Sequence, residues 1–102
     1  MNILLVCAAG MSTSLLINDM KHYADKNTKI KAIAFSELEE FIKDYDVILI
    51  GPQLRFKLNK ISEIAGRHNK NFDVIDAIDY GRINGDRVLA FAKKVFESSS
   101  HI

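Results

Sequence analysis

The segment NILLVCAAGMSTSLL, residues 2–16, contains the features that decide the fold. Residues 2–6 are predicted to form a strand, because an unbroken apolar run is typical of a strand buried on both faces of a parallel sheet. A loop of small residues follows at 7–12, and from residue 13 apolar side chains recur at helical spacing. A buried strand that leads directly into a helix is the first half of a βαβ unit.

The rest of the chain repeats this alternation. Further strands are predicted at residues 30–35, 46–50 and 72–75. Helices are predicted at residues 13–26, 36–43, 58–65 and 88–96. The order βαβαβαβα predicts one α/β domain over residues 1–102, built as an open four-stranded parallel sheet with helices on both faces.

Two of these helices carry more specific expectations. The first is expected to bury one apolar face, made of Leu15, Leu16, Met20 and Tyr23. The second is expected to begin with a capping box, in which Ser36 is the N-cap and Glu39 is the acidic residue three positions later.

The composition limits the possible functions. Fourteen basic and 13 acidic residues give a net charge of +1, which argues against a nucleic-acid partner. The one cysteine excludes an internal disulfide and any CxxC redox or zinc pair. No apolar run approaches the ~20 residues that span a bilayer, and no basic leader precedes the first strand. We therefore expect a cytoplasmic protein without a metal or another cofactor.

The functional residues of such a sheet are expected at one edge. In an open parallel sheet, ligands bind beyond the carboxyl ends of the strands, near the point where the strand order reverses. Three loops are predicted to meet there, at residues 7–12, 51–54 and 76–83. The first of them contains the cysteine, Cys7.

The loop after Cys7 has the residues needed to hold an oxyanion. Small residues allow backbone N–H groups to converge on one point, and the positive end of the following helix adds to the field. Ser12, Thr13 and Ser14 add hydroxyl groups, at least one of which is expected to cap the helix instead. Because these dipoles favour the nucleophilic thiolate, Cys7 is suited to attack phosphorus and to carry the phosphoryl group.

The sequence gives less support to other roles for Cys7. A buried, inert cysteine is common, but its place beside glycine and serine at the functional edge argues against it. The chain has neither a Walker A loop nor a GxGxxG fingerprint. A cysteine phosphatase needs an arginine six positions after the cysteine, where this chain has Thr13. A phosphoryl carrier is therefore favoured, and a low-molecular-weight phosphatase, an oxyanion reductase and a non-catalytic adaptor remain as alternatives.

The loop also resembles a known family. The stretch LVCAAGMSTSLL, residues 5–16, closely resembles the phosphocysteine loop of enzyme IIB components of the sugar phosphotransferase system (PTS). The match is to the lactose/cellobiose class and, within it, to the cellobiose type, which carries C-x-A-G-M-S-T-S. Residues 50–53 and 76–81 are similar to the family's second and third edge loops. The resemblance implies a fold similar to that of low-molecular-weight tyrosine phosphatases.

The resemblance implies one step in a phosphoryl relay. A phosphohistidine of a IIA protein would donate to Cys7, which would pass the group to cellobiose or a related β-glucoside or oligosaccharide on the membrane component IIC. The residues that would bind the phosphoryl group are Ala8, Ala9, Gly10, Met11, Ser12, Thr13 and Ser14. Met11, Gln53 and Tyr80 are candidates for contacts with the partners, and the isolated protein is expected to be a monomer.

Overall fold

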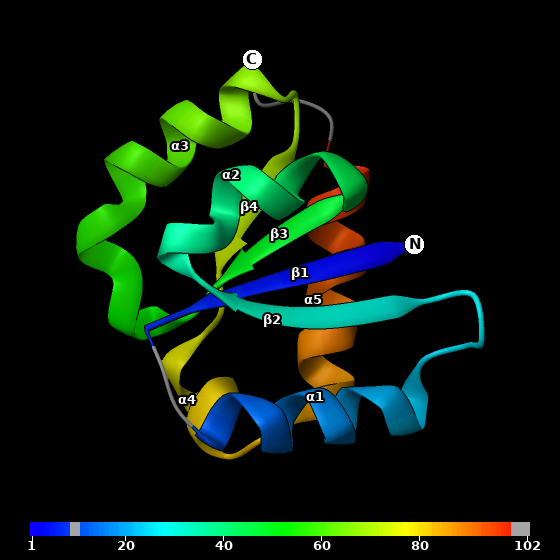
Figure 1. The fold of residues 1–102 in the computed structure, drawn as a ribbon. Coiled ribbons are helices and arrows are strands. Elements are labelled where there is room, and N and C mark those ends of the chain that lie inside the picture. Colours follow the sequence, from blue (N-terminus) through cyan, green and yellow to red (C-terminus); the bar gives the residue numbers. More distant parts are fainter. Residues whose placement is uncertain (9–10, 99–102) are drawn as a thin grey trace.

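The computed structural model describes residues 1–8 and 11–98, and over this part of the chain the strands form one parallel sheet (Figure 1). The strands are β1 (Asn2–Cys7), β2 (Lys29–Ala34), β3 (Val47–Ile50) and β4 (Asn71–Val74). Their order is β2-β1-β3-β4, and every neighbouring pair is parallel. The predicted α/β class and four-stranded parallel sheet are confirmed.

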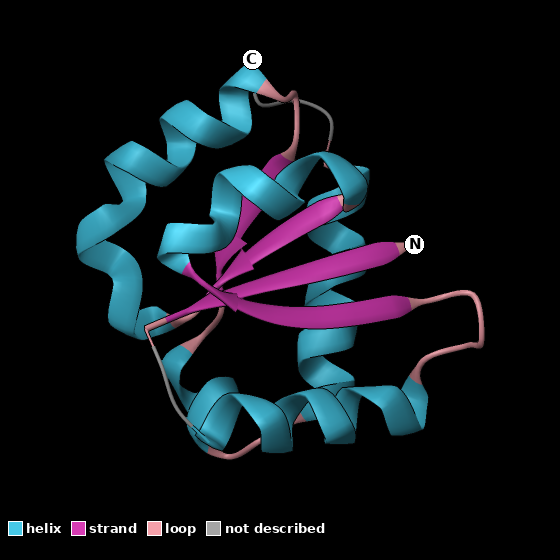
Figure 2. Cartoon of the chain, in the orientation of Figure 1, coloured by secondary structure: helices cyan, strands magenta, loops and turns pink. Residues whose placement is uncertain are grey.

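Helices cover both faces of the sheet (Figure 2). On one face lie α1 (Met11–Tyr23) and α5 (Gly85–Glu97), which pack against each other. On the other face lie α2 (Leu38–Phe41), with the short 3-10 turns η1 (Phe35–Glu37) and η2 (Ile42–Asp44) at its ends, and α3 (Leu58–Arg67). The 3-10 segment η3 (Pro52–Lys57) connects β3 to α3, and the short helix α4 (Ala77–Gly81) follows β4.

The central strand β1 shows why this sequence forms a covered sheet. Successive side chains of a strand point to opposite faces. Ile3 and Leu5 pack under α1 and α5, whereas Leu4 and Val6 pack under α2 and α3. All four are at most 1% exposed, so the absence of polar alternation follows from burial on both faces.

The start and the buried face of α1 differ from the prediction. The helix begins at Met11 and ends at Tyr23, and it buries Thr13, Leu16 and Met20. Leu15 and Tyr23 are 55% and 58% exposed, so their assignment to the core was wrong. Spacings of three and four residues place 13, 16 and 20 on one side of a helix, and residue 15 falls about 100° away from residue 16.

The predicted capping box is also wrong in its residues. The carboxylate of Glu37, rather than that of Glu39, accepts a hydrogen bond from the backbone N–H of Ala34 at 3.1 Å. The chain turns two residues earlier than expected because β2 ends at Ala34 and η1 begins at once.

Helix α5 begins earlier than predicted because Gly85 allows it to approach α1 closely. The Gly85 N–H donates to Asp19 Oδ2 at 2.7 Å. A Cβ on Gly85 would lie 2.5 Å from the Met20 nitrogen and 2.6 Å from the Asp19 carbonyl carbon. Glycine is therefore required here for backbone packing, whereas the sequence favoured a loop.

Among the described residues, no helix is long and apolar enough to span a membrane.

Candidate functional site

The carboxyl ends of the strands meet at one edge of the sheet, as the parallel order requires. Figure 1 shows the arrowheads converging, with the start of α1 and helix α4 nearby. The chain leaves this edge through residue 8 after β1, η1 after β2, η3 after β3 and α4 after β4. The described parts of the three predicted loops therefore follow strands that end at this edge, although residues 52–54 and 77–81 are helical rather than irregular.

Cys7 lies at this edge, as the last residue of β1. The strand was predicted to end at Val6, so Cys7 is one position inside the sheet, paired in register with Ala34 of β2. Its side chain is 7% exposed, and the thiol donates a hydrogen bond to the Ile33 carbonyl oxygen, with 3.4 Å between Sγ and O. The sulfur is thus held by a strand rather than by a loop.

Cys7 and Glu37 bind opposite ends of the same peptide group. The carbonyl of Ile33 accepts from the thiol, and the N–H of the next residue, Ala34, donates to the Glu37 carboxylate. Such chains of hydrogen bonds polarise one another, so the peptide group connects the sulfur to an exposed carboxylate.

Cys7 opens into a shallow hollow of about 300 Å³. The hollow is lined by Cys7, Ala8, Thr13, Ser14, Ala32, Ile33, Ala34 and Glu37. It combines a sulfur, two hydroxyl side chains and one carboxylate, and no arginine is among these lining residues. The hollow therefore offers neutral donors from side chains, without the guanidinium that a cysteine phosphatase uses to hold phosphate.

The first turn of α1 adds backbone donors on the same side. The first four N–H groups of a helix have no partner within the helix, and its N-terminus carries a partial positive charge. Thr13 and Ser14, which belong to this part of α1, also line the hollow. An anion on the sulfur would meet this positive end of the helix.

The structure places some of the predicted phosphate-binding residues and not others. Ala8 and Ser14 are exposed in the hollow, whereas Thr13 is only 2% exposed. Ala9 and Gly10 lie outside the described residues, as do the side chains of Met11 and Ser12. The expectations for those four remain predictions.

Thr13 is paired with a tyrosine that was expected at the rim. Thr13 Oγ1 and the hydroxyl oxygen of Tyr80 lie 2.7 Å apart, in a buried hydrogen bond. Tyr80 is 6% exposed, so its predicted position at the rim was wrong. The Asp76 side chain accepts from the N–H groups of Ile78 and Asp79, which starts α4, and the helix turns Tyr80 inward. The two partners are 67 residues apart, so the sequence carried no signal for this contact.

Gln53 lies at the edge as predicted. Gln53 is exposed in η3. Gly51, two residues earlier, lies between Gln53 and Cys7: a Cβ added to Gly51 would be 3.0 Å from Gln53 Oε1 and 3.7 Å from Cys7 Cα. Gly51 thus lets the β3 edge loop pass close to Cys7, with Gln53 at the surface.

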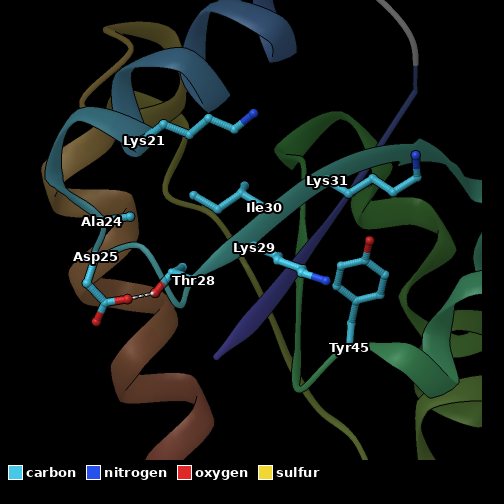
Figure 3. A pocket seen from close by; sticks show the side chains of 8 residues that line it. All are labelled: Lys21, Ala24, Asp25, Thr28, Lys29, Ile30, Lys31 and Tyr45. Atoms are coloured by element: carbon cyan, nitrogen blue, oxygen red, sulfur yellow. Dashed lines mark hydrogen bonds between the residues drawn. The ribbon is translucent and has the colours of Figure 1, made fainter.

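A larger hollow, of about 460 Å³, lies at the opposite edge (Figure 3). Its lining residues are Lys21, Ala24, Asp25, Thr28, Lys29, Ile30, Lys31 and Tyr45. It is close to the amino end of β2 and lacks a nucleophile of the kind that Cys7 supplies. Chemistry, rather than volume, therefore identifies the smaller hollow as the site.

Metal binding has no support in the described part of the chain. Within residues 1–8 and 11–98, no three His, Cys, Asp or Glu side chains are grouped so that they could hold a metal ion.

A family model described as "PTS system, Lactose/Cellobiose specific IIB subunit" matches residues 2–91. The chain belongs to this family. Its fold is similar to the solution structure of a cellobiose-specific phosphotransferase IIB component protein from Borrelia burgdorferi. That protein is 42% identical, with a TM-score of 0.83, and the match covers 100% of this chain and 96% of that one.

Two curated relatives extend the comparison. The oligo-beta-mannoside-specific EIIB component of Bacillus subtilis strain 168 is 38% identical over an alignment of 88 residues, and the match covers 83% of this chain and 85% of that protein. The galactose-specific EIIB component of Lactococcus lactis subsp. cremoris strain MG1363 is 38% identical over an alignment of 101 residues, and the match covers 91% of this chain and 94% of that protein. The predicted family is confirmed, and this IIB component is part of a phosphotransferase that works with IIA and IIC components.

Proposed function

We propose that Cys7 is the phosphoryl acceptor of this IIB component. It takes the group from a phosphohistidine of a IIA component and passes it to a sugar held by the membrane component IIC. The position of Cys7 carries the proposal: the thiol lies at the carboxyl edge of the sheet, in a hollow that also receives the positive end of α1. A phosphatase, an oxyanion reductase or a non-catalytic adaptor would not account for membership in the IIB family.

In the first step, the Cys7 thiolate attacks the phosphorus of phosphohistidine. An S–P bond forms and the P–N bond breaks, while the leaving imidazole takes a proton and becomes neutral. The thiol proton must leave before the attack, and with it the hydrogen bond to the Ile33 carbonyl is lost. First-turn N–H groups of α1 and hydroxyls of the hollow then stabilise the charge on the phosphoryl oxygens.

In the second step, a sugar hydroxyl attacks the same phosphorus. An O–P bond forms, the S–P bond breaks, and the thiolate leaves, while the hydroxyl proton passes to a base or to water. A carrier must bind the phosphoryl group strongly enough to accept it and weakly enough to release it. The side chains of the hollow that supply donors are neutral, which suits this intermediate strength.

The sugar is proposed to be cellobiose or a related oligosaccharide. The resemblance of the Cys7 loop to the cellobiose type supports this choice, as does the structural neighbour named as cellobiose-specific. Because other relatives are named for oligo-beta-mannoside and galactose, the proposal covers a class of sugars rather than cellobiose alone.

Both partners are proposed to dock on the edge that contains Cys7. Three large apolar side chains are exposed in segments that follow the strand ends: Leu15 in α1 is 55% exposed, Phe56 in η3 is 77% and Ile78 in α4 is 62%. Transient interfaces combine such apolar anchors with a polar rim, to which Gln53 would contribute. Met11 remains a candidate, although its side chain lies outside the described residues.

We propose that residues 1–102 act as one domain, monomeric when isolated, in the cytoplasm. No nucleic acid, metal or other cofactor takes part in the proposed relay.

The test is the intact mass of the protein after incubation with phosphoenolpyruvate, the general PTS proteins and a IIA component of this class. The wild type should gain one phosphoryl group that resists acid, unlike phosphohistidine, and the Cys7→Ser variant should gain none. His22 is exposed on α1, so His22→Gln serves as the matched control and should keep the label. No gain with a competent IIA, together with phosphate release from an aryl phosphate, would replace the proposal by a phosphatase.

A further inference from the structure

The buried hydrogen bond between Thr13 and Tyr80 joins the Cys7 hollow to a helix that does not line it. Thr13, on α1, lines the hollow, whereas Tyr80, on α4, is not among its described lining residues. The hydroxyl oxygens are 2.7 Å apart, and the two residues are 2% and 6% exposed, so bulk water does not compete for either group. Among the described residues that line the hollow, Thr13 is the hydrogen-bond partner of Tyr80.

Two hydroxyls in contact place one proton between them and leave one proton free. A phenol is the more acidic group and the better donor, so the favoured arrangement has the Tyr80 O–H donating to Thr13 Oγ1. The Thr13 proton is then free to point into the hollow. The reverse arrangement would direct the lone pairs of Thr13 at any anion on Cys7, which is unfavourable.

We propose that Tyr80 is a positioning residue for phosphoryl transfer, because its hydroxyl directs the Thr13 proton towards a phosphoryl oxygen on Cys7. The proposal rests on the proposed function of Cys7. The Tyr80 hydroxyl does not touch the phosphoryl group itself; it sets the direction of the donor that does and strengthens it by polarisation.

The neighbours of Tyr80 hold it in place for this role. The Asp76 carboxylate caps α4 through two backbone N–H groups. Asp79 Oδ1 accepts from Arg87 Nε at 2.8 Å and from Asn84 Nδ2 at 3.2 Å, which ties α4 to the start of α5. Since the start and the middle of this five-residue helix are held by these bonds, the phenol has a defined position beside Thr13.

The test is a double-variant cycle on Tyr80→Phe and Thr13→Val, each of which removes one hydroxyl and keeps the shape. The readouts are the transfer rate from a phosphorylated IIA component, the ³¹P chemical shift of the phosphocysteine, and the melting curve. Tyr80→Phe should slow transfer about three- to tenfold, the range expected for one hydrogen bond in a buried site, and should move the ³¹P resonance. Thr13→Ser keeps the hydroxyl and should retain most of the rate. Tyr23→Phe, on the exposed end of α1, is the matched control and should leave both readouts unchanged.

The cycle separates positioning from a structural role. If Tyr80 acts through Thr13, Tyr80→Phe should have no further effect on rate or ³¹P shift in the Thr13→Val background. An equal effect in both backgrounds, or none in either, overturns the inference. If Tyr80→Phe does not fold at the assay temperature, Thr13→Val decides, since it removes the donor that Tyr80 is proposed to direct. It should slow transfer at least as much, and an unchanged rate would overturn the inference. If the wild type takes no phosphoryl group, the proposed function of Cys7 is overturned as well. If the wild type is phosphorylated and both variants equal it in transfer rate and ³¹P shift, only this inference is overturned.

Discussion

Replacing Gly85 by alanine should destabilise the protein, because the new methyl group has no room between α5 and α1. The added Cβ would lie 2.5 Å from the Met20 nitrogen and 2.6 Å from the Asp19 carbonyl carbon. Both are backbone atoms of a helix, so relief requires the helices to move apart. That movement would also stretch the 2.7 Å hydrogen bond from the Gly85 N–H to Asp19.

The size of the effect follows from three contributions. Overpacking costs about 1–3 kcal/mol, and weakening a hydrogen bond to a charged group costs up to about 1.5–3 kcal/mol more. Alanine regains up to about 1 kcal/mol in helix propensity. A net loss of about 2 kcal/mol is expected, which for a domain of this size lowers the melting temperature by about 8–16 °C.

Urea and thermal unfolding of the wild type and two variants provide the assay. Gly66 in α3 is the matched control, since a Cβ there would meet nothing within 4 Å. Gly66→Ala should therefore raise the free energy of unfolding by about 0.5–1 kcal/mol. If Gly85→Ala is as stable as the wild type, or if both variants change in the same direction, the steric argument is refuted.

Three further predictions concern the polar surface. Asp76→Ala should lower the free energy of unfolding by about 1 kcal/mol in urea, because α4 loses its N-cap; an unchanged midpoint would contradict this. The pKa of Asp25 is held below its usual value mainly by a hydrogen bond from the Thr28 hydroxyl (Figure 3) and also by one from the backbone N–H of Asn27. The stabilising effect of Asp25 is therefore present at neutral pH and lost as the pH falls through the folded-state pKa. Carboxyl ¹³C NMR titration should show the low pKa, and Thr28→Val should raise it. Glu39→Gln should change stability by less than about 0.5 kcal/mol, since its ion pair with Arg67 is more than half exposed on both sides; a larger loss in thermal unfolding would show that the pair matters.

The fold was predictable because the strands and helices carry strong and separate patterns. The apolar run of β1 and the spacing of Ile61, Ile64 and Ala65 in α3 each indicate one structure, and the tertiary fold preserves both. Helix ends were less predictable, since they depend on contacts between distant segments. The start of α5 at Gly85 is an example, because the residue that receives its N–H is Asp19 on another helix.

The site was predictable where one loop supplies the residues and not where two segments combine. Cys7 and its place at the carboxyl edge followed from the order of strands and helices. The burial of Thr13 and Tyr80 did not follow, because each hydroxyl looks like a surface group in its own segment. A buried pair of hydroxyls becomes visible only when α1 and α4 are placed together.

The peptide group between Ile33 and Ala34 links the Cys7 thiol to the exposed carboxylate of Glu37. A thiol donates a hydrogen bond to the Ile33 carbonyl, whereas a thiolate or a phosphocysteine has no proton to donate there. Since bonds at the two ends of a peptide group strengthen each other, loss of the thiol donor weakens the bond from the Ala34 N–H to Glu37. Glu37 is exposed, so in the proposed relay a partner would meet a carboxylate that is held more tightly beside the Cys7 thiol than beside a phosphocysteine. In the proposed relay, the IIA donor would meet the first arrangement and the IIC component the second.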